Sequence, residues 1–242
     1  MLSVLFVIFS SFKFIPCAIF CEFVRSTSGV FMSRIFCRRC GTCCRKGGPA
    51  LHADDADLVA EGHITLRDLV CIRQGEIADD PRGGGLMPIA TELIKVRGRN
   101  STWACRFFSP EESGCTIYAV RPLECRVLSC VDPSALFAAM DTPYLHRFDF
   151  VERDSALGAC ILEHERQFPM LPAVQLAQSY RQCQDGAVRA ELLDVARREY
   201  YFRQAFADRV CAQDNDLWIY FGRPMWMVLS PLVPALKECD LW

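Results

Sequence analysis

Cys37-Arg-Arg-Cys40-Gly-Thr-Cys43-Cys44 places four cysteines within eight residues of this chain. A second batch follows further along and consists of Cys105, Cys115, Cys125 and Cys130. A gap of two residues lets neighbouring cysteine sulfurs converge on one ion. Thiolates at this spacing hold either tetrahedral zinc or an iron–sulfur cluster. These eight cysteines therefore predict a metal site, with zinc and iron both open as the metal.

The alternative use of so many cysteines is a disulfide framework, since the chain has 15 of them in 242 residues. Such frameworks belong to short secreted domains, whereas tight cysteine spacing in a larger chain is typical of metal ligands. Adjacent Cys43 and Cys44 could be bridged only with strain. We therefore expect reduced thiols and a cytoplasmic protein.

The division of the eight thiols is left open by the spacing. Two zinc ions would use all of them, whereas a single cubane cluster would use four and leave four for structure or redox chemistry. Adjacent side chains on an extended backbone point apart. On that basis Cys43 and Cys44 are expected to serve two centres, or one centre and one structural role.

Composition limits the function in other ways. The formal net charge is -2, and 51% of the residues are apolar. No strong field is present to attract nucleic acid, and the chain can bury a substantial core. The short basic stretch of Arg38, Arg39, Arg45 and Lys46 lies within the first cysteine batch, where it can offset thiolate charge.

The N-terminal extension, residues 1–31, is strongly apolar, and only Lys13 and Glu22 are charged between Leu2 and Val24. About 20 apolar residues can cross a bilayer, so this extension is a candidate membrane anchor. No basic region precedes the apolar run, and no small-residue cleavage pattern follows it. A start at Met32 is therefore the favoured interpretation, and membrane attachment is expected only if Met1 is the true start.

Local patterns predict an α+β fold in which a small cysteine-rich domain precedes a mainly helical region. The expected divisions are 1–31, 32–135 and 136–242. Short helices are predicted at 52–60 and 65–73, with Thr65 as an N-cap. Strands are predicted at 92–96 and 102–108, a loop at 80–85, and an extended run at 115–118. Pro122 suits the first turn of a helix that carries Cys125 and ends at Cys130.

The second half has helical periodicity. Amphipathic helices are predicted at 152–168, 171–184 and 187–212. The tail contains two short apolar runs around a Gly222-Arg-Pro turn.

Other reactive side chains have simpler roles than metal binding. Arg121 and Arg126 are expected to pair with acids such as Glu124 or to shield thiolates. His52 and His63 lack metal-like spacing and are expected on the surface or in loops. Trp103 and Tyr118 are expected in the core. The unpaired cysteines Cys71, Cys160, Cys183, Cys211 and Cys239 are expected to be buried, and Asp54, Asp55 and Asp57 to open a helix.

The cysteine pattern, taken with its neighbours, resembles the YkgJ-type cysteine-cluster family, known as CxxCxxCC. The match continues through Trp103-x-Cys105-x-Phe-Phe and Gly114-Cys115-Thr-Ile-Tyr118, and then through Arg121-Pro122-x2-Cys125-Arg126-x3-Cys130. It covers about residues 35–132. The resemblance implies a zinc- or iron-chelating domain whose eight cysteines hold the metal, with no assigned reaction.

A more distant similarity is to flagellin lysine methylases, which carry a related cysteine cluster. It implies an alternative function as an iron–sulfur redox or protein-modifying enzyme. The motif match ends with the cluster, and the sequence shows no cofactor-binding loop that would support that activity. The expected partner is a metal ion; nucleic acid is not expected, and no protein partner or catalytic residue is identified.

Overall fold

The structure, a computed structural model, describes residues 37, 39–99, 102–112 and 114–238. The N-terminal extension lies outside these residues, and so do the predicted membrane segment and the choice between Met1 and Met32. Within the described ranges, no helix combines the length and the apolar character that a bilayer crossing requires.

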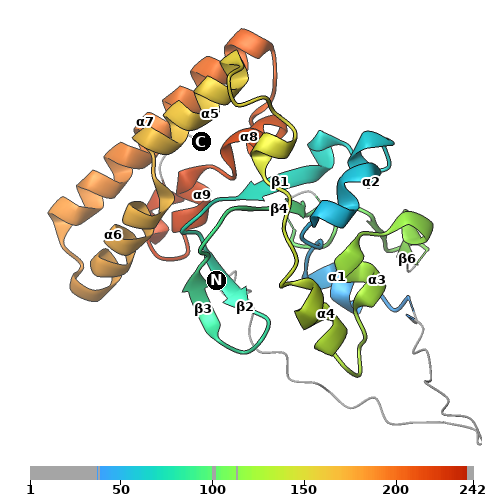
Figure 1. Cartoon of the computed structure of the whole chain (residues 1–242). Coiled ribbons are helices and arrows are strands. Elements are labelled where there is room, and N and C mark those ends of the chain that lie inside the picture. The colour runs from blue at the N-terminus through green and yellow to red at the C-terminus, as the bar shows by residue number, and fades with distance from the viewer. Residues whose placement is uncertain (1–36, 38, 100–101, 113, 239–242) are drawn as a thin grey trace, which may run out of the picture.

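The fold is α+β, as the sequence predicts. Its strands form short antiparallel pairs: β1 (Leu69–Ile72) with β4 (Leu93–Val96), β2 (Ile77–Asp80) with β3 (Gly85–Pro88), and β5 (Phe108–Ser109) with β6 (Gly114–Cys115). The β1–β4 pair runs through the middle of the molecule, between the cysteine-bearing segments and the C-terminal helices (Figure 1). The strand predicted at 92–96 is confirmed, and the predicted loop at 80–85 contains the turn between β2 and β3.

Two predictions of secondary structure are wrong. Residues 65–73 do not form one helix: Thr65 precedes a single 3-10 turn, η2 (Leu66–Asp68), and the chain then enters β1. All four residues of β1 are buried, because the strand lies between β4 and the C-terminal helix α8 (Trp218–Phe221). Burial on both faces favours a short strand over the amphipathic helix. The strand predicted at 102–108 is reduced to Phe108 and an isolated bridge between Cys105 and Gly98.

The helices of the first half are short. They are α1 (Thr42–Lys46), α2 (Ala56–Ala60), α3 (Leu123–Val127) and α4 (Ser134–Ala139), with 3-10 turns η1 (Ala53–Asp55), η3 (Tyr118–Val120) and η4 (Arg147–Asp149). The turn η1 and helix α2 together fill the predicted helix at 52–60. Pro122 precedes α3 as predicted, but the helix ends at Val127, and Cys130 lies beyond it. The extended run predicted at 115–118 ends at Cys115, because Tyr118 begins η3.

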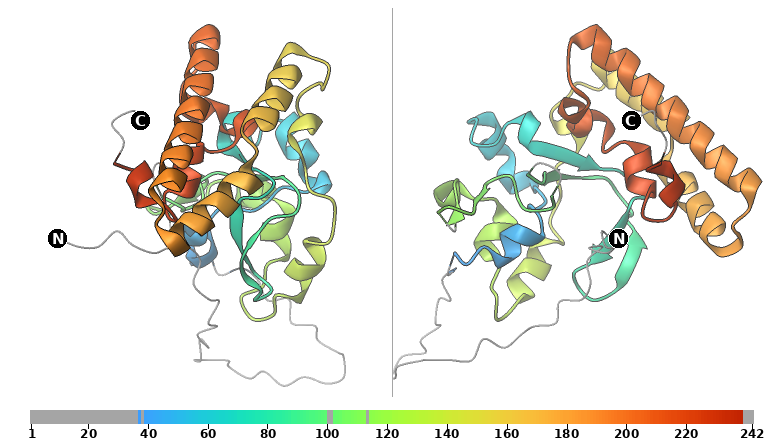
Figure 2. Two further views of the ribbon diagram at one scale, coloured as in Figure 1. Left: turned by 90° about the vertical axis from the view of Figure 1, so that its left-hand side faces the viewer. Right: turned by 180° about the vertical axis from the view of Figure 1, so that it is seen from behind.

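The predicted C-terminal helices are confirmed to within a few residues. They are α5 (Ala156–Gln167), α6 (Met170–Cys183) and α7 (Gly186–Val210), followed by η5 (Asp214–Leu217), α8 (Trp218–Phe221), α9 (Met225–Leu229) and η6 (Pro234–Leu236). Helix α6 packs along the long helix α7, and α5 packs against α8; together these helices form one side of the molecule (Figures 1 and 2). The predicted turn in the tail is present between α8 and α9, with Gly222 at a φ of 71°.

The core of the cysteine-bearing half includes a residue from the C-terminal tail. Leu69 and Ile94, from the β1–β4 pair, are buried in the same cluster as Ile219 of α8. A second core, with Leu192 and Leu229 among its members, joins α6, α7 and α9. The tail therefore completes the packing of the first half, and the boundary near residue 135 remains a prediction.

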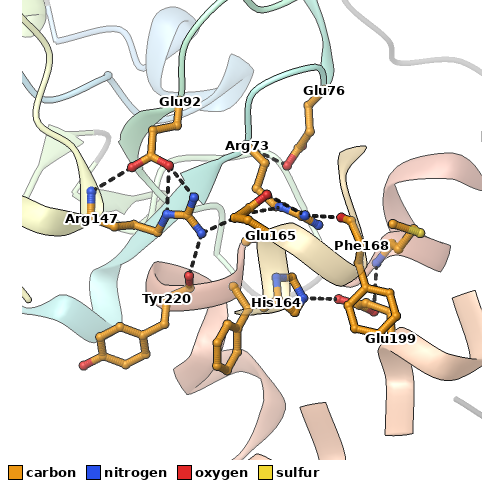
Figure 3. Close-up of polar contacts among 12 residues, drawn as sticks. Arg73, Glu76, Glu92, Arg147, His164, Glu165, Phe168, Glu199 and Tyr220 are labelled. Carbon is orange, nitrogen blue, oxygen red and sulfur yellow. Dashed lines mark hydrogen bonds and ion pairs between the residues drawn. The ribbon is translucent and has the colours of Figure 1, made fainter. Parts of the chain in front are cut away.

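A buried ionic network also joins the two halves (Figure 3). Arg147 of η4 donates through Nε to Glu92 and through Nη1 to Glu165 of α5, at 2.9 Å in both cases. Arg73, which follows β1 and is fully buried, donates through Nε and Nη2 to the same Glu165 at 2.8 Å. Buried charges are stable only when they are paired and hydrogen-bonded, so these contacts fix α5 against the strands.

Candidate metal centre

The first cysteine batch is shaped by a tight turn at Gly41. Its φ of 73° is a left-handed conformation that favours glycine, and a Cβ there would lie 2.7 Å from Cζ of Phe108. The turn leads directly into α1, so that Cys43 and Cys44 stand on its first turn while Cys37 and Cys40 precede the helix. Arg45 holds the turn by donating Nη1 to the Cys40 carbonyl at 3.0 Å.

The sulfur atoms of Cys43 and Cys44 are 3.9 Å apart. The expectation that these side chains point apart is therefore wrong, because they lie on a helix and not on an extended backbone. The hydrogen bond between the two sulfurs lowers the pKa of Cys43 to about 6 and raises the pKa of Cys44.

The second batch approaches the first from different elements. Cys105 is buried, and its backbone N–H donates to the Cys44 carbonyl at 2.7 Å. Cys115 lies in β6, Cys125 in α3, and Cys130 in the loop after α3. Burial raises the pKa of Cys105 to about 11 and raises the pKa of Cys125 well above its ordinary value. Deprotonation of these two thiols therefore requires a positive charge such as a metal ion close by.

Six of the eight predicted ligands line one cavity. A cavity of about 40 Å³ is lined by Cys37, Cys40, Cys43, Cys44, Cys115 and Cys130. The two remaining cysteines lie close to it, since Cys125 interacts electrostatically with Cys105, Cys43 and Cys115. The fold thus brings members of both batches, which are far apart in the sequence, to one cavity.

The donor set fits the metals that the sequence predicts. Sulfur ligands lie about 2.3 Å from zinc, which places two ligands of one tetrahedral ion about 3.8 Å apart. The 3.9 Å between the Cys43 and Cys44 sulfurs agrees with that spacing. In the part of the chain that the structure describes, no group of three or more Cys, His, Asp or Glu side chains is closed around a common point. The thiols are therefore gathered, but they are not in the geometry of a completed site.

Two arginines flank the cavity. The guanidinium carbons of Arg39 and Arg121 lie 3.8 Å and 4.0 Å from the centre of the Tyr118 ring, and that ring lines the cavity. Burial raises the pKa of Cys115, and the charge of Arg121 opposes that rise. Arg121 is therefore placed where its charge favours the ionised form of Cys115, and its predicted role as a shield for a thiolate stays a prediction.

Arg126 pairs with an acid as predicted, but that acid is Asp55 and not Glu124. Its Nη2 lies 3.8 Å from Asp55, whereas Glu124 accepts the backbone N–H of Ala50 at 2.8 Å. Asp55 also accepts the N–H of Leu123 at 2.8 Å and is fully buried. It does more than open a helix, because it anchors the start of α3, which carries Cys125.

The histidine prediction holds for His63 but not for His52. His63 is exposed beside Glu61, at 3.2 Å. His52 is fully buried, and its Nδ1 lies 2.9 Å from the hydroxyl of Thr142. No local sequence pattern indicates either its burial or this contact. Neither residue lines the cavity, so both remain outside the candidate ligand set.

The aromatic and remaining cysteine predictions are correct only in part. Trp103 is 49% exposed, so its predicted core position is wrong; it lies under Arg223 at 5.0 Å. Cys71 is buried as predicted, and Cys160 is half-buried. Cys183 and Cys211 are exposed, contrary to prediction, because they stand at the C-terminal ends of α6 and α7. Cys239 lies outside the described residues.

Sequence reasoning missed two residues that shape the cavity. The Thr42 hydroxyl lies 3.3 Å from the Cys40 sulfur, and this hydrogen bond lowers the pKa of Cys40. Phe108 packs against the Gly41 turn and beneath Arg45, at 4.8 Å. The Gly41-Thr42 pair between the cysteines could have indicated the turn and the start of a helix, since glycine favours turns and threonine often begins a helix.

Comparison with known proteins identifies the same region. Residues 36–143 match the sequence model of the CxxCxxCC family, described as a putative zinc- or iron-chelating domain. No curated protein and no solved structure matches the chain. The matched segment contains both cysteine batches and every element that positions them. The region that contains both cysteine batches, residues 36–143, is thus similar to the CxxCxxCC family.

Proposed function

We propose that this protein binds zinc or iron through its eight clustered cysteines. The ligands in this proposal are Cys37, Cys40, Cys43, Cys44, Cys105, Cys115, Cys125 and Cys130. The observation that supports it best is the single small cavity lined by six of these thiols, with the other two beside it. Thiolate-rich sets select zinc and iron–sulfur clusters over magnesium or calcium.

The surrounding fold gives a physical reason for bound metal. The β5 and β6 strands have two residues each, and α1 and α3 have five residues each. Elements this short contribute little stability of their own, and ligation of a metal by folded residues contributes free energy to folding. Reduced thiols as ligands also fit the reducing cytoplasm, which we propose as its location.

The test is metal analysis of the full chain purified without oxygen. Zinc, iron and acid-labile sulfide are measured per chain, together with the visible spectrum. Bound zinc in a colourless protein supports a chelating role, and iron with matching sulfide supports an iron–sulfur centre. A folded protein with neither metal, after growth with both, overturns the proposal.

A pair of variants tests the ligand assignment. Cys40→Ser removes a thiol that lines the cavity, and we expect it to lose metal. Cys183→Ser removes an exposed thiol at the end of α6 and serves as the control, with metal content unchanged. Equal and full metal content in both variants would contradict the role assigned to Cys40.

A further inference from the structure

Helix α3, which carries Cys125, has only five residues, and its own N-cap provides no side-chain hydrogen bond. A helix of this length does not form in isolation, because the cost of the first turn exceeds the gain from its few hydrogen bonds. Its start must therefore be supported by another part of the chain. Hydrogen bonds from residues 50–55, which follow α1, provide this support.

The carboxylate of Asp55 caps α3 from a distant position in the sequence. Asp55 is fully buried, and its Oδ1 accepts the N–H of Leu123, the first residue of the helix, at 2.8 Å. Its Oδ2 accepts the N–H of His52 at 3.0 Å, so both oxygens are used. The guanidinium of Arg126 lies 3.8 Å from Oδ1 and provides the opposite charge that a buried carboxylate needs. Asp55 therefore contacts residues on both sides of Cys125.

Glu124, the neighbour of Cys125, makes a second connection to the same segment. Its Oε2 accepts the N–H of Ala50 at 2.8 Å, and Ala50 is buried. Its Oε1 lies 3.5 Å from Nε2 of His52. A buried N–H that loses its acceptor is costly, so a displacement of α3 away from residues 50–55 is opposed.

The His52 ring connects Glu124 to the loop after α4. The Thr142 hydroxyl donates to the Ala139 carbonyl at 2.7 Å, so it accepts from Nδ1 of His52 at 2.9 Å. The Tyr144 ring packs against the imidazole, with the ring centres 4.3 Å apart. These contacts fix the imidazole, which in turn supports the carboxylate of Glu124.

The segment that supports α3 is also tied to the first cysteine batch and to the central strands. Ala50 follows Cys44 by six positions. Between them, the Pro49 carbonyl accepts the N–H of Val96 in β4 at 2.9 Å. Gly48 lies so close to the same strand that an added Cβ would be 2.7 Å from Cβ of Val96. The segment thus has a fixed place on β4, and it connects the first batch to α3 by a short stretch of chain.

We propose that Asp55 and Glu124 are positioning residues of the metal site, and that they set the place of Cys125 relative to the first cysteine batch by fixing α3 to residues 50–55. This inference rests on the proposed function. Neither carboxylate is among the proposed ligands. Residues that orient metal ligands in this way change metal affinity about 10- to 100-fold when they are replaced.

The test uses the full chain, purified without oxygen together with the metal that it binds. Asp55→Asn keeps the shape of the side chain but replaces one acceptor oxygen with a donor. We expect metal loss to excess EDTA to be about tenfold faster than in the wild type. Iodoacetamide labelling of the metal-loaded chain, followed at each cysteine by mass spectrometry, should be faster at Cys125. Labelling of Cys71, which is fully buried in β1, should not change.

Asp149→Asn is the matched control. Asp149 forms the same kind of capping box in η4, where it accepts the N–H of His146 at 2.7 Å, and it is exposed. Among the residues that the structure describes, no hydrogen bond connects its side chain to α3. Metal loss and Cys125 labelling should therefore equal those of the wild type.

Glu124→Gln is a second variant, for the case in which Asp55→Asn does not fold. The new amide oxygen can still accept the N–H of Ala50, so the backbone contact is kept. The negative charge beside His52 is lost, and support for α3 is weakened. Cys125 should again be labelled faster than in the control.

The outcomes separate this inference from the proposed function. Metal loss and Cys125 labelling at control rates in both variants overturn the positioning role, while metal binding stands. Equal acceleration at Cys125 and Cys71 also overturns it, because that result indicates a general loosening of the fold. A wild-type chain that holds no metal overturns the proposed function itself.

Discussion

Arg147, in the turn η4, and Glu165, on helix α5, form a hydrogen-bonded ion pair with Nη1 and Oε1 2.9 Å apart. The same arginine binds Glu92, and the same glutamate binds Arg73. Burial alone would raise the pKa of Glu165, but Arg73 and Arg147 lower it to about 2. The two halves of the molecule are thus joined by charges that have little access to water.

Substitution of Arg147 tests this connection. Arg147→Met leaves Glu92 without its partner and Glu165 with Arg73 alone, and removal of one partner from a buried ion pair costs about 3–5 kcal/mol. We expect a loss of that size in the free energy of unfolding, measured by urea denaturation. Arg166→Met is the matched control, because Arg166 pairs with Glu163 on the surface and should change stability little. Equal losses in the two variants would contradict the buried network.

The buried histidine His164 predicts that acid destabilises the fold. Burial lowers its pKa to about 4 from an ordinary 6.5, although its Nε2 lies 3.1 Å from Glu199. Because the unfolded chain takes up the proton more readily, the free energy of unfolding should fall as the pH drops below 6.5 and level off below 4. The full effect is about 3 kcal/mol.

The variant His164→Gln isolates this effect. It should be less stable than the wild type at pH 7 but should show a flatter decline between pH 7 and 5, measured by urea denaturation at each pH. His63→Gln removes an exposed histidine and should keep the wild-type slope. An unchanged slope in His164→Gln would show that other groups, such as the metal-binding thiols, cause the acid sensitivity.

A methyl group at Gly41 should disturb the metal site. Gly41→Ala adds a Cβ that meets the Phe108 ring at a left-handed position, so the turn between Cys40 and Cys43 must shift. We expect both a lower melting temperature and a lower metal content. Gly62→Ala is the control: its φ of 77° is equally left-handed, but the new Cβ would have nothing within 4 Å. It should lose about 1–2 kcal/mol of stability and no metal.

Metal removal should loosen one half of the protein more than the other. Chelation under reducing conditions removes the ligation that supports α3 and the β5–β6 pair, whereas α6 and α7 are packed in a separate apolar core. Hydrogen exchange followed by mass spectrometry should show lost protection in peptides from 102–130 and little change in those from 186–210. Equal loss in both regions would indicate that the metal supports the whole fold as one unit.

The C-terminal helices α5, α6 and α7 could be predicted because their signal is local. Apolar residues recur at helical intervals over many turns, and prolines or glycines separate the segments. The candidate cysteine ligands could also be named from the sequence, since tight cysteine spacing is typical of metal sites, but the spacing leaves open which sulfurs share an ion. The structure of short segments such as 65–73 could not be predicted correctly, because a run of a few apolar residues fits either a helix or a buried strand.

The sequence by itself determined which side chains bind metal in our proposal and which class of fold surrounds them. Only the tertiary structure decided that Cys43 and Cys44 face the same point, that Cys105 is buried while Cys130 is exposed, and that α8 completes the core around β1. The reason is how far apart in the sequence the interacting residues lie. Residue type and spacing determine local structure over a few positions. Burial and charge pairing instead depend on contacts between segments that are far apart in the chain, such as the ion pair of Arg73 and Glu165.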